Sequence, residues 1–269
     1  MPHLERVRPK FTASRDSDRF PFSVPVIRAL TSLDLGKPVT FFVGENGSGK
    51  STLLEGIALA AGLPTVGSDD SDRDPWLEGQ RALGRALTLV WTKRVRRGFF
   101  LRAEDFFGFQ RRLARERSEL LGRLSEIDSE YQDRSDLARG LAKGPALSSL
   151  AAMDRRYGPD PDARSHGEAF LNLFQNRFVP DSLVLLDEPE AALSPQNQLG
   201  LVAMVMGMVD QGAQFVIATH SPIVLAVPGA RIYSFDGGTI SERRYQELEH
   251  VRLTRDFLTD PDRFLRHLA

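Results

Sequence analysis

The chain has 269 residues, a length that suits one large domain or a domain with an insertion. Hydrophobic residues make up 41% and charged residues 26%, as in a globular protein with a full core. A net charge of -1 excludes a global basic field for nucleic acid or an acidic membrane. The absence of cysteine excludes disulfides, a thiol nucleophile and cysteine-based metal sites.

Residues 1–10 are charged and lack the apolar segment of a signal peptide. No stretch approaches the roughly 18 apolar residues of a membrane-spanning helix. We therefore expect a cytoplasmic protein with no membrane span of its own.

The first elements alternate between polar and apolar stretches. Residues 1–19 are polar and predict a loose lead-in. Residues 20–26 alternate large apolar residues with proline and serine, which predicts an edge strand because proline cannot donate to a β-ladder. Residues 38–43 are apolar and β-branched and predict a buried strand, and residues 53–61 are rich in leucine and alanine and predict a helix.

A phosphate-binding pattern, G-x-x-x-x-G-K-[ST], lies between that strand and that helix. Its glycines let backbone N–H groups curl around an anion, and the helix points the positive end of its dipole at the same place. Lys50 adds a charge for the β- and γ-phosphates of ATP, and the Ser51 hydroxyl can ligate Mg²⁺. The expected nucleotide-binding residues are Gly44, Asn46, Gly47, Ser48, Gly49, Lys50, Ser51 and Thr52.

The next stretch predicts a loop and two strands. Residues 62–79 contain glycine, proline and an acidic cluster and predict a surface loop. Residues 87–95 and 98–102 predict two strands joined by Arg96 and Arg97. The basic group here suits the solvated side of a hairpin better than a polyanion site, because the global charge is neutral. It consists of Lys93, Arg94, Arg96, Arg97 and Arg102.

A helical segment follows. From Phe106 to Tyr131, apolar residues recur at steps of three, four or seven, which predicts a helix of about 25 residues and about 38 Å. Residues 132–164 are broken by glycine and proline, and they predict a helical subdomain that ends in a loop.

A second functional motif lies at residues 182–190. An apolar strand there ends in Asp187 and Glu188, and Pro189 stops the strand. Neighbouring residues of a strand point to opposite faces, so the two carboxylates can divide their work. We expect Asp187 to hold Mg²⁺ together with Ser51, and Glu188 to orient or deprotonate the attacking water. A solvated turn is the alternative for such a pair, but the phosphate loop in the same chain favours catalysis.

The last elements contain a histidine at a strand end. A helix is predicted over 196–211 and a strand over 213–219, which leads into His220. Parallel sheets place ligand groups at the carboxyl ends of strands, so His220 is expected to reach the γ-phosphate; a structural hydrogen bond is the alternative. Residues 230–235 and 239–243 flank a hairpin turn, and the tail from Arg252 is expected to be helical.

Four segments taken in order resemble the ABC-type ATPase superfamily, in particular its small AAA-labelled ATPases related to chromosome-maintenance, repair and overcoming-lysogenization-defect ATPases. They are 44–52, 164–168, 187–195 and 219–221, of which 164–168 is similar to the family's signature loop. The resemblance covers most of residues 20–245. It implies an α/β P-loop fold with a mostly parallel core sheet flanked by helices and an antiparallel β subdomain. It also implies one domain over 1–269, with a helical subdomain at about 104–164 inserted before the signature and Walker B half.

By this resemblance, Ser165 and Gly167 bind the γ-phosphate that a second subunit holds, so the site is complete only in an ATP-bound homodimer. The helix expected at 168–178 begins beside them and favours an anion there. Ser165 and Glu168 also fit a capping box, which is compatible with the first role.

Several positions depart from the family pattern or stay open. His166 stands where transporters usually have glycine, and Ser194 where the loop after Walker B usually has aspartate. Phe20 and Phe22 are the candidates for the aromatic that stacks on adenine, and a place in the core is the alternative for either. The glutamine that the family carries after the strand near residue 102 has no counterpart that the sequence identifies, and Glu104 and Gln110 are the candidate substitutes.

The function expected first is an ATP-hydrolysing switch that dimerises with ATP and Mg²⁺ and acts on an unknown macromolecular partner. The alternatives are the nucleotide-binding subunit of a membrane transporter and a DNA repair or chromosome factor. The Walker motifs lie too close together for a long coiled-coil arm, although a small clamp fits between them. A small-molecule kinase fits less well because Glu188 beside Asp187 suits water activation, and a nucleotide-binding module without turnover stays open.

Overall fold

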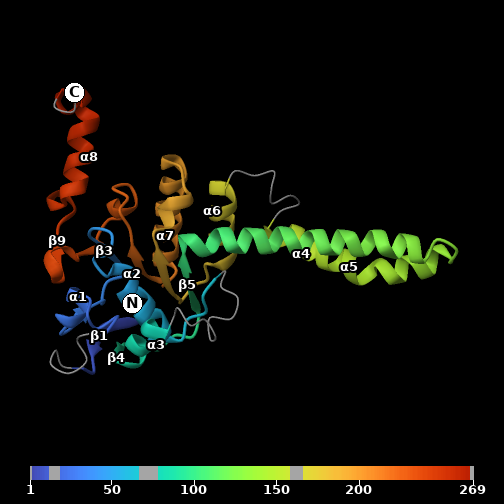
Figure 1. The fold of residues 1–269 in the computed structure, drawn as a ribbon, viewed down its shortest axis with the longest axis horizontal. Coiled ribbons are helices and arrows are strands. Elements are labelled where there is room, and N and C mark those ends of the chain that lie inside the picture. Colours follow the sequence, from blue (N-terminus) through green and yellow to red (C-terminus); the bar gives the residue numbers. More distant parts are fainter. Residues whose placement is uncertain (1, 12–18, 67–77, 158–165, 267–269) are drawn as a thin grey trace.

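A six-stranded sheet forms the centre of the computed structural model, which describes residues 2–11, 19–66, 78–157 and 166–266 (Figure 1). Its strand order is β5-β6-β7-β3-β8-β9, and only β9 runs antiparallel to its neighbour. The strands are β3 (Val39–Val43), β5 (Gly98–Arg102), β6 (Leu183–Asp187), β7 (Gln214–Ala218), β8 (Arg231–Ser234) and β9 (Ser241–Arg243). The predicted α/β class and the mostly parallel core sheet are confirmed.

The central strands are apolar on both faces, as expected for a parallel sheet covered on both sides. Along β3, Phe41 packs into one hydrophobic core and Phe42 into the other. Alternate residues of β6 and β7 divide in the same way, so the sheet separates two cores.

Helices from different parts of the chain cover the two faces. Helices α1 (Pro25–Arg28), α2 (Lys50–Ala61) and α3 (Glu78–Arg85) contribute Ile27, Leu53 and Leu83 to one core. Helices α6 (His166–Arg177) and α7 (Pro195–Asp210) contribute Phe174 and Val205 to the other. Helix α2, whose first turn follows the phosphate pattern, is therefore packed into the core on one face of the sheet.

A second sheet is antiparallel and has the order β2-β1-β4. It consists of β1 (Leu4–Pro9), β2 (Leu33–Asp34) and β4 (Leu87–Trp91). The antiparallel β subdomain is therefore present. The prediction that residues 1–19 form a loose N-terminal segment is wrong for residues 4–9, which form β1. Leu4 and Val7 are fully buried, and backbone pairing with two strands decides their structure. Residues 12–18 lie outside the described residues.

Two further local predictions are wrong. The edge strand expected over 20–26 is a turn that leads into α1, whose first residue is Pro25, a position that proline favours in helices. The loop expected over 62–79 is confirmed for residues 62–66 and ends at α3, and its residues 67–77 lie outside the described residues. Strands β4 and β5 form no hairpin, because they belong to different sheets.

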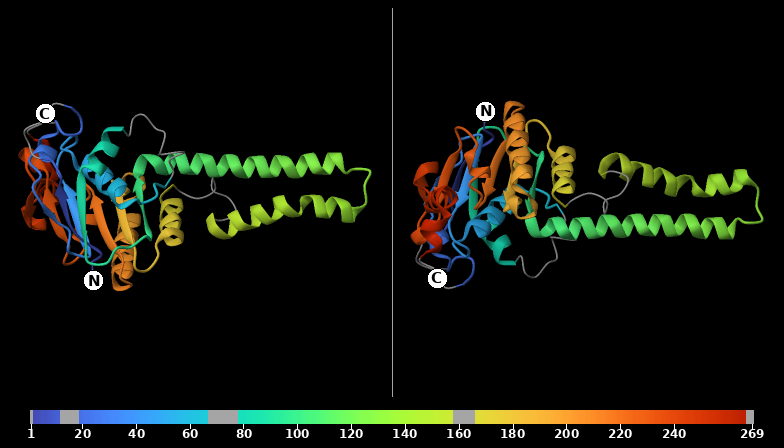
Figure 2. Two further views of the ribbon diagram at one scale, coloured as in Figure 1. Left: turned by 90° about the horizontal axis from the view of Figure 1, so that it is seen from below. Right: turned by 90° about the horizontal axis from the view of Figure 1, so that it is seen from above.

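Helices α4 (Ala103–Glu130) and α5 (Asp136–Tyr157) run side by side and project from the sheet as a helical hairpin (Figure 2). Arg117 of α4 pairs with Asp154, and Lys143 Nζ lies 2.6 Å from Asp128 Oδ1. The helical subdomain predicted in 132–164 is present as α5, but the expected interruption by glycine and proline is wrong, because α5 continues through the exposed Pro145. The loop expected after it lies largely outside the described residues. Packing against α4 outweighs the proline here.

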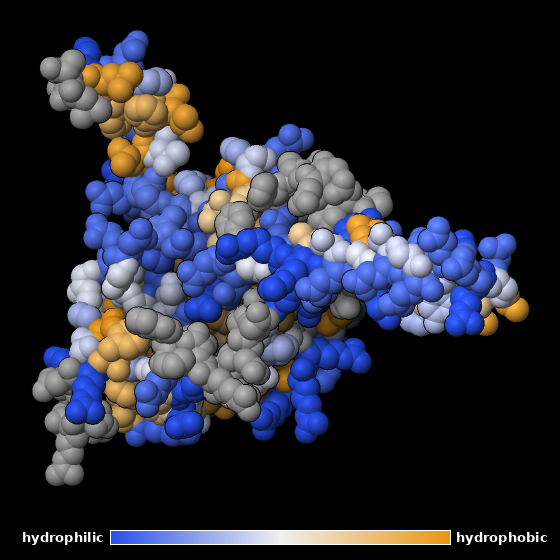
Figure 3. All heavy atoms as spheres, turned by 45° about the vertical axis from the view of Figure 1, so that its right-hand side comes forward, coloured by the Kyte–Doolittle hydropathy of each residue, from blue (hydrophilic) through white to orange (hydrophobic). Residues whose placement is uncertain are grey.

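The chain ends in a hairpin of β8 and β9 and in the helices α8 (Glu249–Thr259) and α9 (Pro261–Leu265). Leu253, Leu258 and Leu265 are exposed, and Figure 3 shows hydrophobic atoms gathered on these projecting helices. Among the described helices, none is both long enough and apolar enough to cross a membrane.

Candidate active site

The phosphate pattern forms a tight loop between the end of β3 and the start of α2. Gly44, Gly47 and Gly49 have φ angles of 141°, 81° and 99°, which side-chain-bearing residues rarely adopt. Gly49 also lacks room for a side chain, because a Cβ there would lie 2.6 Å from Val26 Cγ2. The loop's curvature therefore depends on glycine for backbone reasons and, at Gly49, on the close approach of α1.

Lys50 lies inside this loop and is only 4% exposed. Its Nζ donates hydrogen bonds to the carbonyls of Gly44 at 2.6 Å and Glu45 at 2.9 Å. Burial lowers the pKa of Lys50, and the nearby carboxylates of Glu188 and Asp187 act in the opposite direction. The ammonium group is thus held where an anion bound by the loop would meet it.

Ser51 and Asp187 meet at the same place from different elements. Ser51 Oγ on α2 donates to Asp187 Oδ1 at the end of β6 over 3.1 Å. Burial raises the pKa of Asp187 to about 7, and the charges of Glu55 and Glu188 add to this effect. A buried carboxylate beside a hydroxyl is a hard oxygen pair that suits Mg²⁺.

The described residues contain no group of three or more His, Cys, Asp or Glu side chains that could hold a metal by themselves. Mg²⁺ commonly takes one or two protein ligands together with substrate phosphates and water. The pair formed by Ser51 and Asp187 fits this mode, since it lies next to the phosphate loop.

Glu188 follows directly on Asp187 and has a φ angle of 49°, an uncommon conformation for a non-glycine residue. Its backbone N–H donates to the Ala218 carbonyl at 2.9 Å, which joins the ends of β6 and β7. Its side chain is 43% exposed, and Oε1 lies 3.7 Å from His220 Nε2. The structure therefore brings the two expected catalytic groups together, with Glu188 open to solvent.

Glu190 fixes the turn that carries His220. Its Oε1 accepts hydrogen bonds from the backbone N–H groups of His220 at 2.7 Å and Ser221 at 3.2 Å. Ser221 Oγ in turn donates to Gln198 Oε1 on α7 at 2.6 Å. Sequence reasoning gave these three residues no role, although Glu190 and Ser221 lie inside the segments that carried the resemblance.

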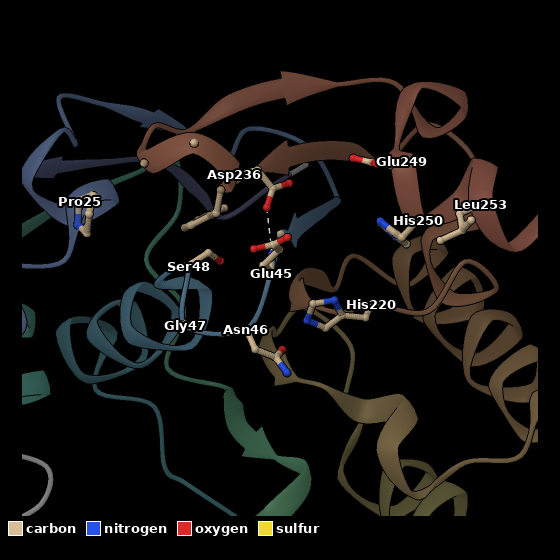
Figure 4. A pocket seen from close by; sticks show the side chains of 14 residues that line it. Pro25, Glu45, Asn46, Gly47, Ser48, His220, Asp236, Glu249, His250 and Leu253 are labelled. Carbon is tan, nitrogen blue, oxygen red and sulfur yellow. Dashed lines mark hydrogen bonds between the residues drawn. The ribbon is translucent and has the colours of Figure 1, made fainter. Parts of the chain in front are cut away.

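A cavity of about 670 Å³ opens over the outer side of the phosphate loop (Figure 4). One wall consists of Glu45 to Ser48 and the turn Asp236–Gly238, where Asp236 Oδ1 accepts a hydrogen bond from the Glu45 backbone at 2.9 Å. The opposite wall carries His220 and residues of α8. Sequence reasoning missed Asp236 and α8 as parts of this site.

Arg102 was expected on the solvated side of a hairpin, and this prediction is wrong. Its side chain is 18% exposed and pairs with Glu55 at 3.1 Å and Asp105 at 2.9 Å. It lies opposite Asp187 in the ladder between β5 and β6. Arg102 therefore compensates buried acids beside the Ser51 and Asp187 pair.

The remaining expected residues lie apart from the cavity or outside the description. Ser165 lies outside the described residues. Gly167 is buried in the first turn of α6, and a Cβ there would lie 2.3 Å from Asn197 Nδ2. Phe20 and Phe22 do not line the cavity, and Glu104 pairs with Arg102 at 3.4 Å. Gln110 lies half-buried on α4, and Thr52 in the first turn of α2.

Comparison with known proteins finds relatives that are named as ATP-binding proteins. A family model described as "AAA domain" matches residues 23–86. The cobalt import ATP-binding protein CbiO of Salmonella typhimurium is 24% identical over 260 residues, which cover 87% of this chain and 83% of that protein. The lipoprotein-releasing system ATP-binding protein LolD of Chromohalobacter salexigens is 29% identical over 205 residues, which cover 74% of this chain and 78% of that protein.

Among solved structures, a nucleotide-free ATP-binding cassette from an ABC transporter matches with a TM-score of 0.45 and 19% identity. The match covers 97% of this chain and 96% of that one.

Proposed function

We propose that this chain, a member of the ABC-type ATPase superfamily, is an ATPase that hydrolyses Mg-bound ATP as a molecular switch. The proposal rests on the convergence of five residues at the carboxyl ends of the central strands β3, β6 and β7. They are Lys50, Ser51, Asp187, Glu188 and His220. These residues come from three separate strand ends, so their meeting depends on the whole fold. The sequence relatives, which are named as ATP-binding proteins, support the same activity.

Each residue has a distinct part in the proposed reaction. The loop N–H groups and Lys50 bind the phosphates, and Ser51 with Asp187 holds Mg²⁺, which neutralises charge on the phosphates when bound. Glu188 accepts a proton from the attacking water or orients it, because it is exposed and lies beside the buried Asp187. His220, held by Glu190, donates a hydrogen bond toward the terminal phosphate.

The switch acts, in this proposal, through an ATP-bound homodimer in the cytoplasm, with Ser165 and Gly167 binding the nucleotide of the second copy. Because Gly167 is buried against Asn197 in the single chain, this contact requires the start of α6 to move when the dimer forms. Its partner is an unidentified macromolecule. A role as the nucleotide-binding subunit of a membrane transporter is the second candidate, and the names of CbiO and LolD favour it. A DNA-associated role is the third, and the projecting helical hairpin is the feature that suits it.

Lys50→Ala tests the nucleotide site. We expect ATP affinity to fall at least about tenfold, because the variant loses a charged hydrogen bond donor to the phosphates. The measurement is titration calorimetry with ATP and Mg²⁺. Lys93→Ala serves as the control, because Lys93 is exposed and does not line the cavity. Equal ATP affinity in wild type and Lys50→Ala would contradict the assigned site.

Turnover assays separate the candidate roles. Phosphate release is measured with wild-type protein alone, with duplex DNA, and with membranes from the source cell. Stimulation by DNA favours the DNA-associated role, and stimulation by membranes favours the transporter role. If no phosphate is released under any of these conditions, the proposed ATPase activity is contradicted, and a nucleotide-binding module without turnover is the remaining function.

A further inference from the structure

Helix α8 brings an additional imidazole to the nucleotide cavity. His250 lies in the first turn of α8 and lines the cavity together with Glu249 and Leu253. In Figure 4, His250 and His220 face the phosphate loop residues Glu45 and Asn46 across the cavity. None of the motif segments contains this helix, so its presence at the site comes from the fold alone.

Polar atoms without partners gather in this cavity. Among the described residues, Ser48 Oγ, His220 Nε2 and His250 Nε2 are buried side-chain atoms that have no hydrogen bond partner, and all three residues line the cavity. Buried polar groups in native proteins are nearly always paired. The three atoms have almost no accessible surface, and a polar ligand in the cavity would pair them once their side chains turn toward it.

Contacts on the core side of α8 fix the position of His250. Leu248 and Val251, on either side of the Glu249–His250 pair, are buried in the hydrophobic core. Tyr245 Oη donates to the Pro222 carbonyl at 2.9 Å, which ties the start of this segment to the turn that carries His220. The two imidazoles are therefore held by connected structure.

His250 is expected to act as a neutral hydrogen bond donor. Burial lowers the pKa of His250, and the neighbouring His220 lowers it further, while Asp236 acts in the opposite direction. A neutral imidazole keeps one N–H donor. Carboxylates of Glu45, Asp236 and Glu249 also line the cavity, so a neutral imidazole there supplies a hydrogen bond donor and no positive charge.

We propose that His250 is a nucleotide-binding residue that donates a hydrogen bond from Nε2 to the terminal phosphate of the triphosphate held by the loop. Together with His220, it contacts the phosphate from the wall opposite Ser48. This inference rests on the proposed function, since it uses the same nucleotide, and it adds a residue that distinguishes the triphosphate from the diphosphate.

His250→Ala, His250→Asn and the control Arg252→Ala test this role. Arg252 lies on the same helix, is exposed and does not line the cavity. We expect His250→Ala to weaken ATP binding about tenfold and to leave ADP binding within about twofold, because only ATP carries the terminal phosphate. The asparagine variant, which keeps an N–H donor, recovers most of the loss, and Arg252→Ala matches wild type. Calorimetry with ATP and with ADP gives the affinities.

Other outcomes are distinct. If His250→Ala binds ATP as wild type does, or loses ATP and ADP affinity equally, the inference is overturned. Urea unfolding without nucleotide identifies a purely structural role, which would lower the free energy of unfolding and leave the ratio of ATP to ADP affinity unchanged. If wild-type protein binds no ATP, the proposed function itself fails, and this result is separate from the behaviour of His250.

Discussion

Asp187 has a carboxyl group whose burial makes stability depend on pH. Its folded pKa is raised from 3.8 to about 7, so the folded protein keeps a proton that the unfolded chain releases. In metal-free protein, the free energy of unfolding contributed by this group is lost as pH rises from about 4 through about 7. We expect Asp187→Asn to remove this loss, which amounts to at most about 4 kcal/mol at pH 8.

Urea unfolding with a chelator at pH 5, 6, 7 and 8 measures this effect. Relative to wild type, the free energy of unfolding of Asp187→Asn should increase with pH. Asp133→Asn, in the exposed turn between α4 and α5, is the matched control and should follow the wild-type curve. A difference between Asp187→Asn and wild type that stays constant across the pH range would show that the carboxyl group does not titrate as stated.

At the residue scale, sequence reasoning named the groups that lie next to recognisable patterns. Lys50, Ser51, Asp187 and His220 follow strands whose apolar character is visible in the sequence, and the structure brings them together. Asp236 and His250 were missed because the sequence around Asp236 indicates only a turn and nothing near His250 indicates a site. Asp236 meets the loop across 191 positions of sequence, a contact that only the complete sheet creates.

Among the elements, β7 and β1 are joined by one buried amide. Gln214 Oε1 accepts hydrogen bonds from the backbone N–H groups of His3 at 2.9 Å and Leu4 at 2.7 Å. Its Nε2 donates to the carbonyls of Leu4 at 2.9 Å and Leu35 at 2.7 Å. This side chain therefore attaches the antiparallel sheet to the central sheet.

Gln214→Ala should lower the free energy of unfolding by about 3 kcal/mol or more, because it leaves buried backbone groups without partners. Guanidinium unfolding followed by circular dichroism measures the change. Gln211→Ala is the control, since the Gln211 side chain is exposed and donates to the Gly207 carbonyl one turn earlier in the chain; it should cost less than about 0.5 kcal/mol. Similar costs for the two variants would remove Gln214 from this role.

The predicted elements failed where partners distant in sequence decide the conformation. Strand β1 looks polar in sequence, yet Leu4 and Val7 alone provide its buried face. The apolar pattern of β4 and β5 predicted strands but not their sheets, because local alternation carries no information about pairing partners. By contrast, β3, α2, β6 and α7 were predicted within a few residues, since each has a strong local pattern.

For the whole molecule, the central prediction concerns Glu188→Gln. The variant keeps Lys50, Ser51 and Asp187 and should bind ATP, but turnover should fall at least about 100-fold because the proton acceptor is lost. Since hydrolysis is proposed to open the homodimer, the dimer should accumulate with ATP and Mg²⁺. Phosphate release and light scattering after size-exclusion chromatography measure the two effects.

Two results would contradict this prediction. Turnover within a few-fold of wild type would remove Glu188 from the mechanism. A Glu188→Gln protein that binds ATP yet stays monomeric at every concentration tested would leave the ATPase assignment standing and remove the dimer from the proposal. Gln198→Ala is a useful companion, because it disturbs the bond to Ser221 while leaving the carboxylates intact.

The attachment of α4 has a mechanical consequence. The helix begins at Ala103, directly after Arg102, which lies opposite Asp187 in the sheet. Its 28 residues span about 42 Å. A tilt of about 5° at its base would therefore move the far end through about 4 Å over that length. The projecting pair of helices would therefore act as a lever that pivots beside Asp187, the carboxylate proposed to hold the metal.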